Sequence, residues 1–324
     1  MWAAENLLRG VPRDAVIEML QSHGVAREEA ERRVDAVRAS PAFTAARGLS
    51  RRVRRLELIA SLQTNLARDA PHPGAVERRE HVEAEEFFDR YYATNTPVVI
   101  TGLCAGWEAV RRWTPAYFKE RIGEVEVQVT SGRDDDPDYD MHTAQHSRLT
   151  RMADFVDRVM NASETNDFYL VANNRNMDRG PLQVLFDDVT LPAGVLDPAR
   201  LAGCVALWFG PGGTVTPLHH DTSNILFAQI YGRKRVTLIA PAEVSVLNGM
   251  RGVYAAVDCE QPDLTKYPAF AGVVQKRVEL GPGDTLFLPV GWWHHVRALE
   301  VSISLAFTNF VRPNSFDWYR PGAC

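Results

Sequence analysis

The sequence has few cysteines, few lysines and no long apolar run. Its four cysteines lie far apart and form no C-x-x-C pair, so they indicate neither a disulfide framework nor a zinc site. Isolated thiols fit a reducing compartment, so we expect a cytoplasmic protein. No apolar run approaches the roughly 18–20 residues that a membrane-spanning helix needs. The first residues, MWAAENLLRGVPRD, lack the features of a signal peptide, and we expect no membrane association.

An excess of positive charge is also absent. The 324 residues include 36 Lys and Arg against 41 Asp and Glu, a formal net charge of -5. Because phosphate binding needs clustered positive charge, this balance argues against a nucleic-acid partner. The one basic run, residues 51–55, is interpreted as the solvated face of a helix. Hydrophobic residues make up 45% of the chain, enough for a substantial core.

Residues 1–70 are predicted to be helical. Two short helical runs are separated near Gly24 and end before Pro41, and a third repeats apolar residues at helical spacing. Short paired helices suggest a docking or dimerisation element, so a homodimer is one option. The segment 69–80, DAPHPGAVERRE, has the proline and glycine content of a linker. A second domain is predicted to follow over residues 80–324.

The second domain is predicted to change from mixed helices and strands to strands alone. TPVVITG (96–102) and EVEVQVT (124–130) are predicted strands on either side of the helix WTPAYFKERIG (113–123). From Cys204 onward, short strands alternate with turns such as PGG, GPGD and PVGWW. This rhythm is typical of a sandwich or barrel. We therefore predict a mainly β domain with flanking helices, preceded by a small helical region.

Candidate metal ligands occur in the last third of the chain. His219 and Asp221 are two residues apart, so on an extended strand both side chains point to the same face. A later segment, GPGDTLFLPVGWWHHV (281–296), supplies further histidines. Two imidazoles and one carboxylate on one side of a metal leave the opposite positions open, as in non-haem Fe(II) oxygenases. An H-x-D pair alone is common in unrelated strands, so this interpretation depends on other residues.

Two polar residues support the metal-site interpretation, because each is spaced along its strand so as to share a face with apolar residues. Lys234 has the strand parity of Val236 and Leu238, so we expect it to point into the barrel. A lysine there needs an anionic partner, and a dicarboxylate would provide one. Asn309 has the parity of Phe307, where its amide needs hydrogen-bond partners. Each residue taken alone could be an ordinary polar side chain near a strand end.

With these residues in place, the sequence resembles the JmjC-type cupin oxygenases, which fold as a double-stranded β-helix (jelly roll). The match covers TP-x-H-x-D, FAQI-x-G-x-KR, GPGD, WWHH and the final asparagine, and more weakly TPVVITG and FYLVANN. Within the family the sequence is most similar to the branch of the asparaginyl hydroxylase that acts on hypoxia-inducible factor. The likeness spans roughly residues 80–312 and leaves out the helical N-terminus.

The resemblance implies Fe(II), 2-oxoglutarate as co-substrate, and O2. It implies that His219, Asp221 and His294 are the catalytic iron ligands. The implied co-substrate contacts are Lys234 at the distal carboxylate, Thr216 and the Tyr169 hydroxyl beside it, and Asn309 at the metal-chelating end.

Some positions depart from the family pattern or stand outside it. Ile225 occupies the place of an asparagine that contacts the co-substrate in close relatives, and Asn224 lies beside it. Four other histidines are expected to pack, to support the ligands, or to lie at the surface near the acidic stretch 134–140: His220 and His295, then His142 and His146.

Three functions remain open. The resemblance favours a dioxygenase that hydroxylates a C–H bond of an amino-acid side chain in a protein or peptide, and the acidic stretch would favour a basic or neutral chain. A hydroxylase of a small molecule or of a modified tRNA nucleoside is the alternative, because substrate choice lies in surface loops. A non-catalytic cupin binding module is the third, and the intact ligand set together with Lys234 disfavours it.

Overall fold

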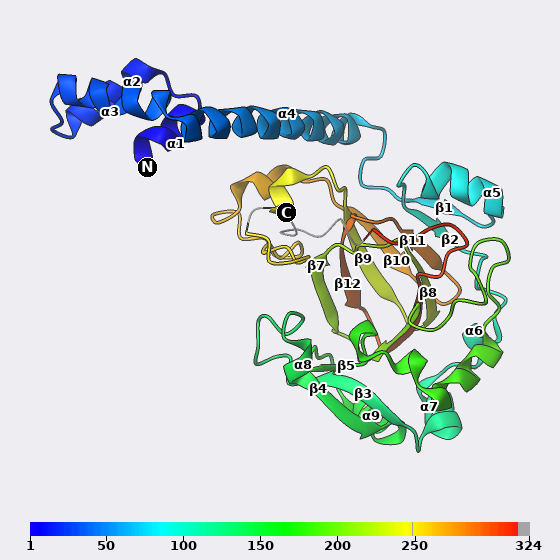
Figure 1. Cartoon of the computed structure of the whole chain (residues 1–324). Coiled ribbons are helices and arrows are strands. Elements are labelled where there is room, and N and C mark those ends of the chain that lie inside the picture. The colour runs from blue at the N-terminus through cyan, green and yellow to red at the C-terminus, as the bar shows by residue number, and fades with distance from the viewer. Residues whose placement is uncertain (248, 317–324) are drawn as a thin grey trace. The chain divides into compact units, whose positions relative to one another are not determined.

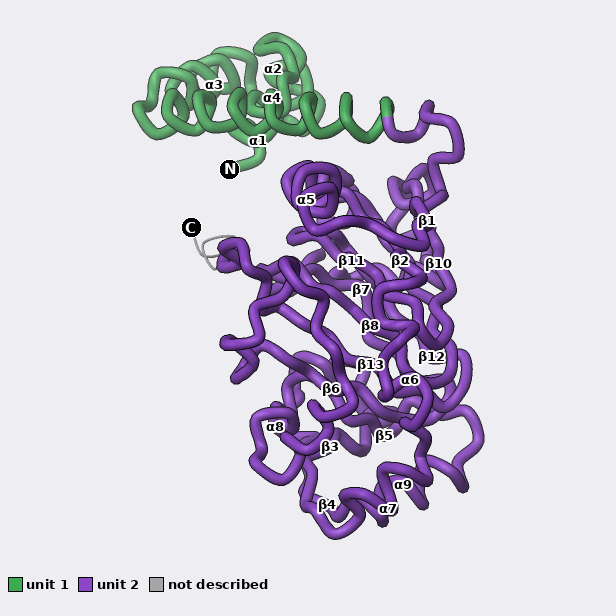
Figure 2. Tube along the Cα trace, turned by 90° about the vertical axis from the view of Figure 1, so that its right-hand side faces the viewer, with its two compact units in different colours: residues 1–66 green, residues 67–324 purple. Residues whose placement is uncertain are grey.

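The computed structural model describes residues 1–247 and 249–316. The chain folds into two compact units, residues 1–66 and a second unit that begins at Ala67 (Figure 2). Among the described residues, no helix is both long enough and apolar enough to cross a lipid bilayer.

The first unit is helical, as predicted. Its helices are α1 (Trp2–Leu8), α2 (Arg13–Ser22), α3 (Arg27–Ala39) and most of α4 (Pro41–Asp69). Gly24, with a φ of 86°, turns the chain between α2 and α3. A small core joins Val16 and Ile17 of α2 to Ala30 and Val34 of α3. Apart from the buried Phe43, the large apolar side chains along α4 are exposed instead: Leu49, Val53, Leu56, Leu58, Ile59, Leu62 and Leu66. A docking or dimerisation role for this unit stays a prediction.

The second unit is built on two sheets with a shared apolar core, the predicted jelly roll (Figure 1). The six-stranded sheet has the order β1-β2-β11-β8-β13-β6 and the four-stranded sheet the order β10-β9-β12-β7. All neighbours pair antiparallel except β1 and β2. The strands are β1 (Glu77–Arg79), β2 (Val98–Ile100), β6 (Val205–Gly210), β7 (Val215–His219), β8 (Ile225–Tyr231), β9 (Lys234–Ile239), β10 (Lys276–Leu280), β11 (Thr285–Leu288), β12 (Trp293–Ala298) and β13 (Ser302–Phe307).

Helices and a third sheet, of order β4-β3-β5, contribute to a larger core on the other face of the six-stranded sheet. Strand alternation decides which residues enter it: Ile303, Leu305 and Phe307 of β13 lie in this core, whereas Ala306 faces the core between the sheets. The flanking elements are α5 (Ala84–Phe87), η1 (Phe88–Tyr92), α6 (Glu108–Arg112), α7 (Pro115–Ile122), β3 (Glu126–Ser131), α8 (Thr143–His146), β4 (Ser147–Arg151), α9 (Met152–Asn161), β5 (Phe168–Tyr169), η2 (Ala172–Asn174), η3 (Asn176–Asp178) and η4 (Gly180–Asp188).

A long connection, residues 240–275, joins β9 to β10 and includes η5 (Val244–Leu247) and η6 (Pro268–Gly272). Its apolar side chains pack against the four-stranded sheet in a third core. That core contains Val246, Val257, Cys259 and Phe270 from the connection with Leu218, Ile239 and Trp293 from β7, β9 and β12. The connection therefore belongs to the folded domain.

The predicted linker over residues 69–80 is partly a strand. Within it, β1 pairs in parallel with β2, with Glu77 opposite Val98. The Lys276 ammonium donates to the carbonyls of Pro73 and Ala75 at 2.7 and 2.9 Å. The ordered domain therefore begins before residue 77. The sequence pattern does not reveal this boundary, because the pairing of β1 uses the backbone and needs no apolar side chains.

Two shortened chains test this boundary. A chain that begins at residue 71 keeps β1, whereas one that begins at residue 80 loses it together with the Arg78–Asp284 ion pair. Each backbone hydrogen bond removed costs about 0.5–1.5 kcal/mol, so the shorter chain should have the lower melting temperature in calorimetry. Both should retain metal binding. An insoluble or metal-free chain from residue 71 would mean that the N-terminal helices belong to the catalytic fold.

Candidate active site

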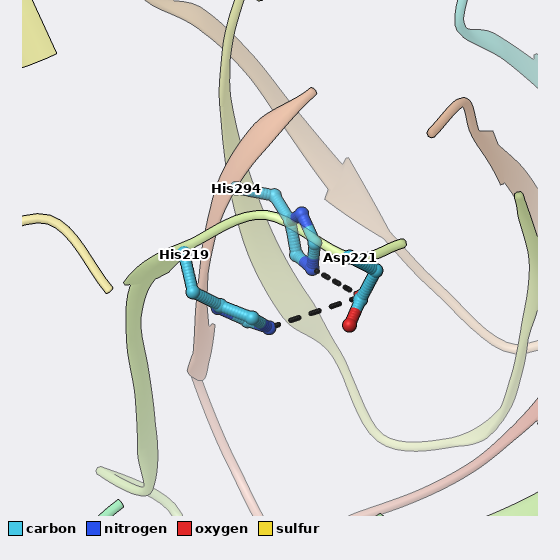
Figure 3. A group of neighbouring side chains, drawn as sticks. All are labelled: His219, Asp221 and His294. Atoms are coloured by element: carbon cyan, nitrogen blue, oxygen red, sulfur yellow. Dashed lines mark ion pairs between the residues drawn. The ribbon is translucent and has the colours of Figure 1, made fainter. Parts of the chain in front are cut away.

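Strand pairing brings the three predicted metal ligands together (Figure 3). His219 ends β7, Asp221 follows two residues later, and His294 lies on β12 directly opposite His219 in the antiparallel register. The Asp221 Oδ2 atom is 3.3 Å from His294 Nε2 and 3.9 Å from His219 Nε2. Ligand bonds of about 2.1 Å at right angles would set such atoms roughly 3 Å apart. A small movement is therefore enough to centre all three on one ion.

Backbone carbonyls hold both imidazoles by Nδ1, so that Nε2 of each ring faces the metal position. His219 Nδ1 lies 2.7 Å from the carbonyl of Pro217, and His294 Nδ1 lies 2.9 Å from that of Trp292. In each case the acceptor comes from two residues earlier in the chain. With the proton on Nδ1, the Nε2 lone pair is free to bind a metal, and the ring orientation is fixed.

The protonation states suit a cation. Burial lowers the pKa of His219 to about 4, with a further contribution from His294, so His219 is neutral at pH 7. Burial alone would raise the pKa of Asp221, but His294 and the other neighbouring histidines lower it to about 2. The Asp221 side chain is 37% exposed, and it faces the site's cavity. The site thus offers the neutral imidazole of His219, the imidazole of His294 and one carboxylate.

The ligand triad opens onto a cavity of about 850 Å³. Pockets for small molecules span about 300–1,000 Å³, so there is room for a five-carbon dicarboxylate and for part of a second molecule. The wall comes from the two large sheets, from the β9–β10 connection and from residues between 140 and 178, which include Tyr169 of β5. Lining residues that bear on the chemistry are Thr216, Tyr169, Trp208, Phe227, Lys234 and Tyr254.

Lys234 is a buried charge that lines this cavity. It is 1% exposed, and its Nζ donates 2.9 Å to the Tyr169 hydroxyl. The rings of Tyr169, Trp208 and Phe227 surround the ammonium at 5.3–5.9 Å. Desolvation lowers the Lys234 pKa to about 7. A bound carboxylate would stabilise the charged form, so the pocket suits an anion at this end.

Asn309 does not line the cavity. Its Nδ2 donates 2.8 Å to the carbonyl of Asp197, and its Oδ1 is buried with no partner among the described residues. It has the parity of Phe307, which faces the outer core, whereas Ala306 and Thr308 line the cavity. The predicted contact with the metal-chelating end therefore has no support, because that side of β13 faces away from the metal.

Asn224 does not supply the co-substrate amide that Ile225 replaces. Ile225 lines the cavity, but the Asn224 amide is engaged elsewhere. Its Nδ2 donates to Asn314 Oδ1 at 2.9 Å, and its Oδ1 accepts from the Val290 backbone at 2.8 Å. Asn224 thus fixes the chain near the site, and the wall at residue 225 is apolar.

Other side chains near the site differ from expectation or were not anticipated. His146 is not a surface residue, because its side chain is 13% exposed and bonds to Asp136 at 3.0 Å. Tyr254 was missed: it forms a bridge with His219, with ring centroids 5.6 Å apart. Trp208 was also missed, and its buried Nε1 has no partner among the described residues. No spacing in the sequence indicates that residue 254 returns to the metal site.

Comparisons with known proteins agree with this geometry. Residues 84–313 match the model of the cupin-like domain family. The chain is 31% identical over 232 residues to lysine-specific demethylase 8 of Xenopus tropicalis, covering 69% of this chain and 50% of that protein. It is 30% identical over 243 residues to lysine-specific demethylase JMJ30 of Arabidopsis thaliana, covering 72% and 54%. It is 27% identical over 250 residues to tRNA wybutosine-synthesizing protein 5 of Danio rerio, covering 73% and 76%.

The chain thus spans about half the length of the first of these relatives. These similarities support the JmjC-type 2-oxoglutarate oxygenase superfamily, and they do not support the asparaginyl hydroxylase branch that the motif resemblance indicated. Short motifs around the metal and co-substrate are shared across the superfamily, so they cannot separate its branches.

The role of the triad as a metal site is testable by substitution. Asp221→Ala and His219→Ala should each weaken Fe(II) binding by more than about 100-fold, because even indirect support of a ligand is worth about 10–100-fold. Anaerobic calorimetric titration measures this. His142→Ala, a histidine away from the triad, is the control and should bind Fe(II) normally. Triad variants that both bind as many equivalents of Fe(II) as the wild-type chain would exclude the assignment.

Proposed function

The chain belongs to the cupin-like domain family, and from this premise we propose that it is an Fe(II)- and 2-oxoglutarate-dependent dioxygenase that hydroxylates an amino-acid side chain within a protein or peptide. The observation that carries the proposal is the pairing, in one cavity, of a His/Asp/His triad with a buried lysine. The triad provides the facial ligand set that non-haem Fe(II) oxygenases use, and the lysine provides a countercharge for a carboxylate.

His219, Asp221 and His294 would hold the iron, and Lys234 with Tyr169 and Thr216 would hold the co-substrate. When bound, iron and 2-oxoglutarate with O2 supply the oxidation that converts C–H to C–OH. The chain's own part is positioning. The carbonyls of Pro217 and Trp292 orient the imidazoles, and the Lys234 ammonium fixes one end of the dicarboxylate. Apolar walls such as Phe227 exclude water from the reacting centre.

The charges at the cavity wall favour a basic or neutral substrate group. Two charged pairs that include lining residues are internally neutralised, Arg175 with Asp178 and Arg251 with Asp138. Asp140 is only partly neutralised: its Oδ1 forms an ion pair with Arg133 at 3.6 Å, and its Oδ2 is buried with no partner among the described residues. Burial raises the Asp140 pKa to about 6, so this carboxyl would gain from a cationic partner.

Two relatives are named for acting on lysine, which supports a protein side chain as the substrate. A modified tRNA nucleoside is the second candidate, because the wybutosine-synthesizing protein is matched over most of its own length. The net charge of -5 and the unpaired Asp140 oxygen weigh against a phosphate-rich substrate. A non-catalytic binding module would have no use for a complete triad and a buried lysine in the same cavity.

The reaction is tested by substrate-stimulated succinate release. Peptides rich in Lys and Arg should stimulate it and gain 16 Da by mass spectrometry, without release of formaldehyde, which would instead indicate demethylation. Free amino acids, small metabolites and tRNA form the other arms. Stimulation by one of those alone, with no response to any peptide or host protein, would overturn the proposed substrate while leaving the oxygenase assignment in place.

Asp140→Asn tests the proposed recognition of a basic group. Loss of one charge-assisted hydrogen bond costs about 1.5–3 kcal/mol, so kcat/KM should fall roughly 10–100-fold for basic peptides and little for neutral ones. Asp135→Asn, an exposed carboxylate on the same loop, is the matched control. Equal losses on both peptide classes would mean that Asp140 acts through the fold.

Lys234 makes co-substrate binding depend on pH. Its pKa of about 7 in the free protein should rise when the dicarboxylate binds, so binding takes up a proton and affinity should fall as pH increases above 7. Lys234→Arg keeps its charge at every accessible pH and should abolish this dependence. Lys234→Ala should bind 2-oxoglutarate roughly 10–100-fold more weakly and still bind iron. An unchanged affinity of Lys234→Ala for 2-oxoglutarate would contradict the assignment of Lys234 as the carboxylate partner.

A further inference from the structure

A second group of potential metal ligands lies on the opposite side of the strand that carries His294. His295 is the next residue of β12, so its side chain points to the other face of the sheet. There it meets the β9–β10 connection, in the core that contains Cys259 and Trp293. The two adjacent histidines therefore lie in different environments. His294 lines the cavity, and His295 faces the core between the sheet and the β9–β10 connection.

Three donors of different chemistry converge at this position. Asp258, Cys259 and His295 each offer one ligand atom, and these atoms all lie within 4.8 Å of one another. Cys259 and His295 are 1% and 4% exposed, and Asp258 is exposed. A thiol, an imidazole and a carboxylate at this separation come from two chain segments that only the fold brings together. The spacing in the sequence, with no C-x-x-C pair, could not reveal them.

A second carboxylate, the fourth potential ligand, lies beside the group. Glu260 Oε2 is 3.8 Å from His295 Nε2, too far for a hydrogen bond. The carboxylate is held in place by Arg297, whose Nε and Nη2 lie 2.7 and 2.6 Å from Oε2. Asp258 and Glu260 thus place two carboxylates beside His295 and Cys259, and the second of them is paired with Arg297. A nucleophilic role for Cys259 does not fit, because burial raises the pKa of its thiol to about 12 and leaves it out of reach of a substrate.

We infer that Asp258, Cys259 and His295 form a structural Zn²⁺ site, with Glu260 or water as the fourth ligand. A thiolate and an imidazole with a carboxylate are ligands of Zn²⁺, which prefers four of them in a tetrahedron. A sulfur ligand disfavours Mg²⁺ and Ca²⁺. Zinc displaces the thiol proton on binding, so a high thiol pKa in the metal-free protein is compatible with the site.

The site would fasten the β9–β10 connection to β12. That connection also carries Arg251 and Tyr254, which line the catalytic cavity, and Tyr254 forms the bridge with His219. Zinc on one side of the sheet would thus fix a wall of the cavity on the other side. This inference does not depend on the proposed reaction, because it concerns ligands that none of the catalytic steps uses.

Cobalt substitution distinguishes the two sites, because only the second contains sulfur. The full chain, stripped of metal and titrated with Co²⁺, should bind two equivalents and develop a thiolate-to-cobalt charge-transfer band in the near ultraviolet. His219→Ala should bind one equivalent and keep the band. Cys259→Ser and His295→Gln should each bind one equivalent, Cys259→Ser without the band. Zn²⁺ should displace Co²⁺ and bleach the band.

Cys204→Ser is the matched control, because among the described residues Cys204 is the thiol that lines the catalytic cavity. This variant should keep both equivalents and the band. The cobalt retained by the triad in Cys259→Ser reports that the variant is folded. Absence of a thiolate band in the wild-type chain would overturn the inference, as would a band that Cys204→Ser removes and Cys259→Ser keeps.

Discussion

The antiparallel pairing of β12 with its two neighbours is the constraint on which the site depends. On one side, β7 sets His294 opposite His219. On the other, β9 sets Lys234 opposite Ala298, four residues further along β12. At roughly 3.3 Å per residue, the backbones of the metal ligand and of the lysine are about 13 Å apart along the strand. The His294 and Lys234 side chains both line the same cavity, whose volume has room for a short dicarboxylate.

Much of this arrangement could be predicted from the sequence, because it follows strand periodicity. The two-residue spacing of His219 and Asp221 and the parity of Lys234 with Val236 depend only on the alternation of side chains along a strand. The predicted strand at 124–130 and helix at 113–123 correspond to β3 and α7, whose apolar spacing and Pro115 are local signals. Such features need no knowledge of which elements lie next to one another.

The predictions that the structure does not support concern local patterns with two physical meanings. Asn309 does share its face with Phe307, but parity does not say which face of β13 meets the cavity, and an apolar core lies on both faces. Strand β1 was hidden because its three residues, Glu77, Arg78 and Arg79, are polar and pair only through the backbone. Tyr254 and Cys259 depend on the path of a long connection with little regular structure, which no periodicity encodes.

The two backbone hydrogen bonds at the ligand imidazoles have a consequence for how a metal enters the site. Each ring is anchored to a carbonyl of its own strand, so it occupies its binding rotamer before an ion arrives and loses little conformational entropy when it binds. The two imidazoles are preorganised by short-range contacts rather than by the surrounding loops. Loops that shape substrate selection can therefore diverge between relatives without retuning the metal coordination.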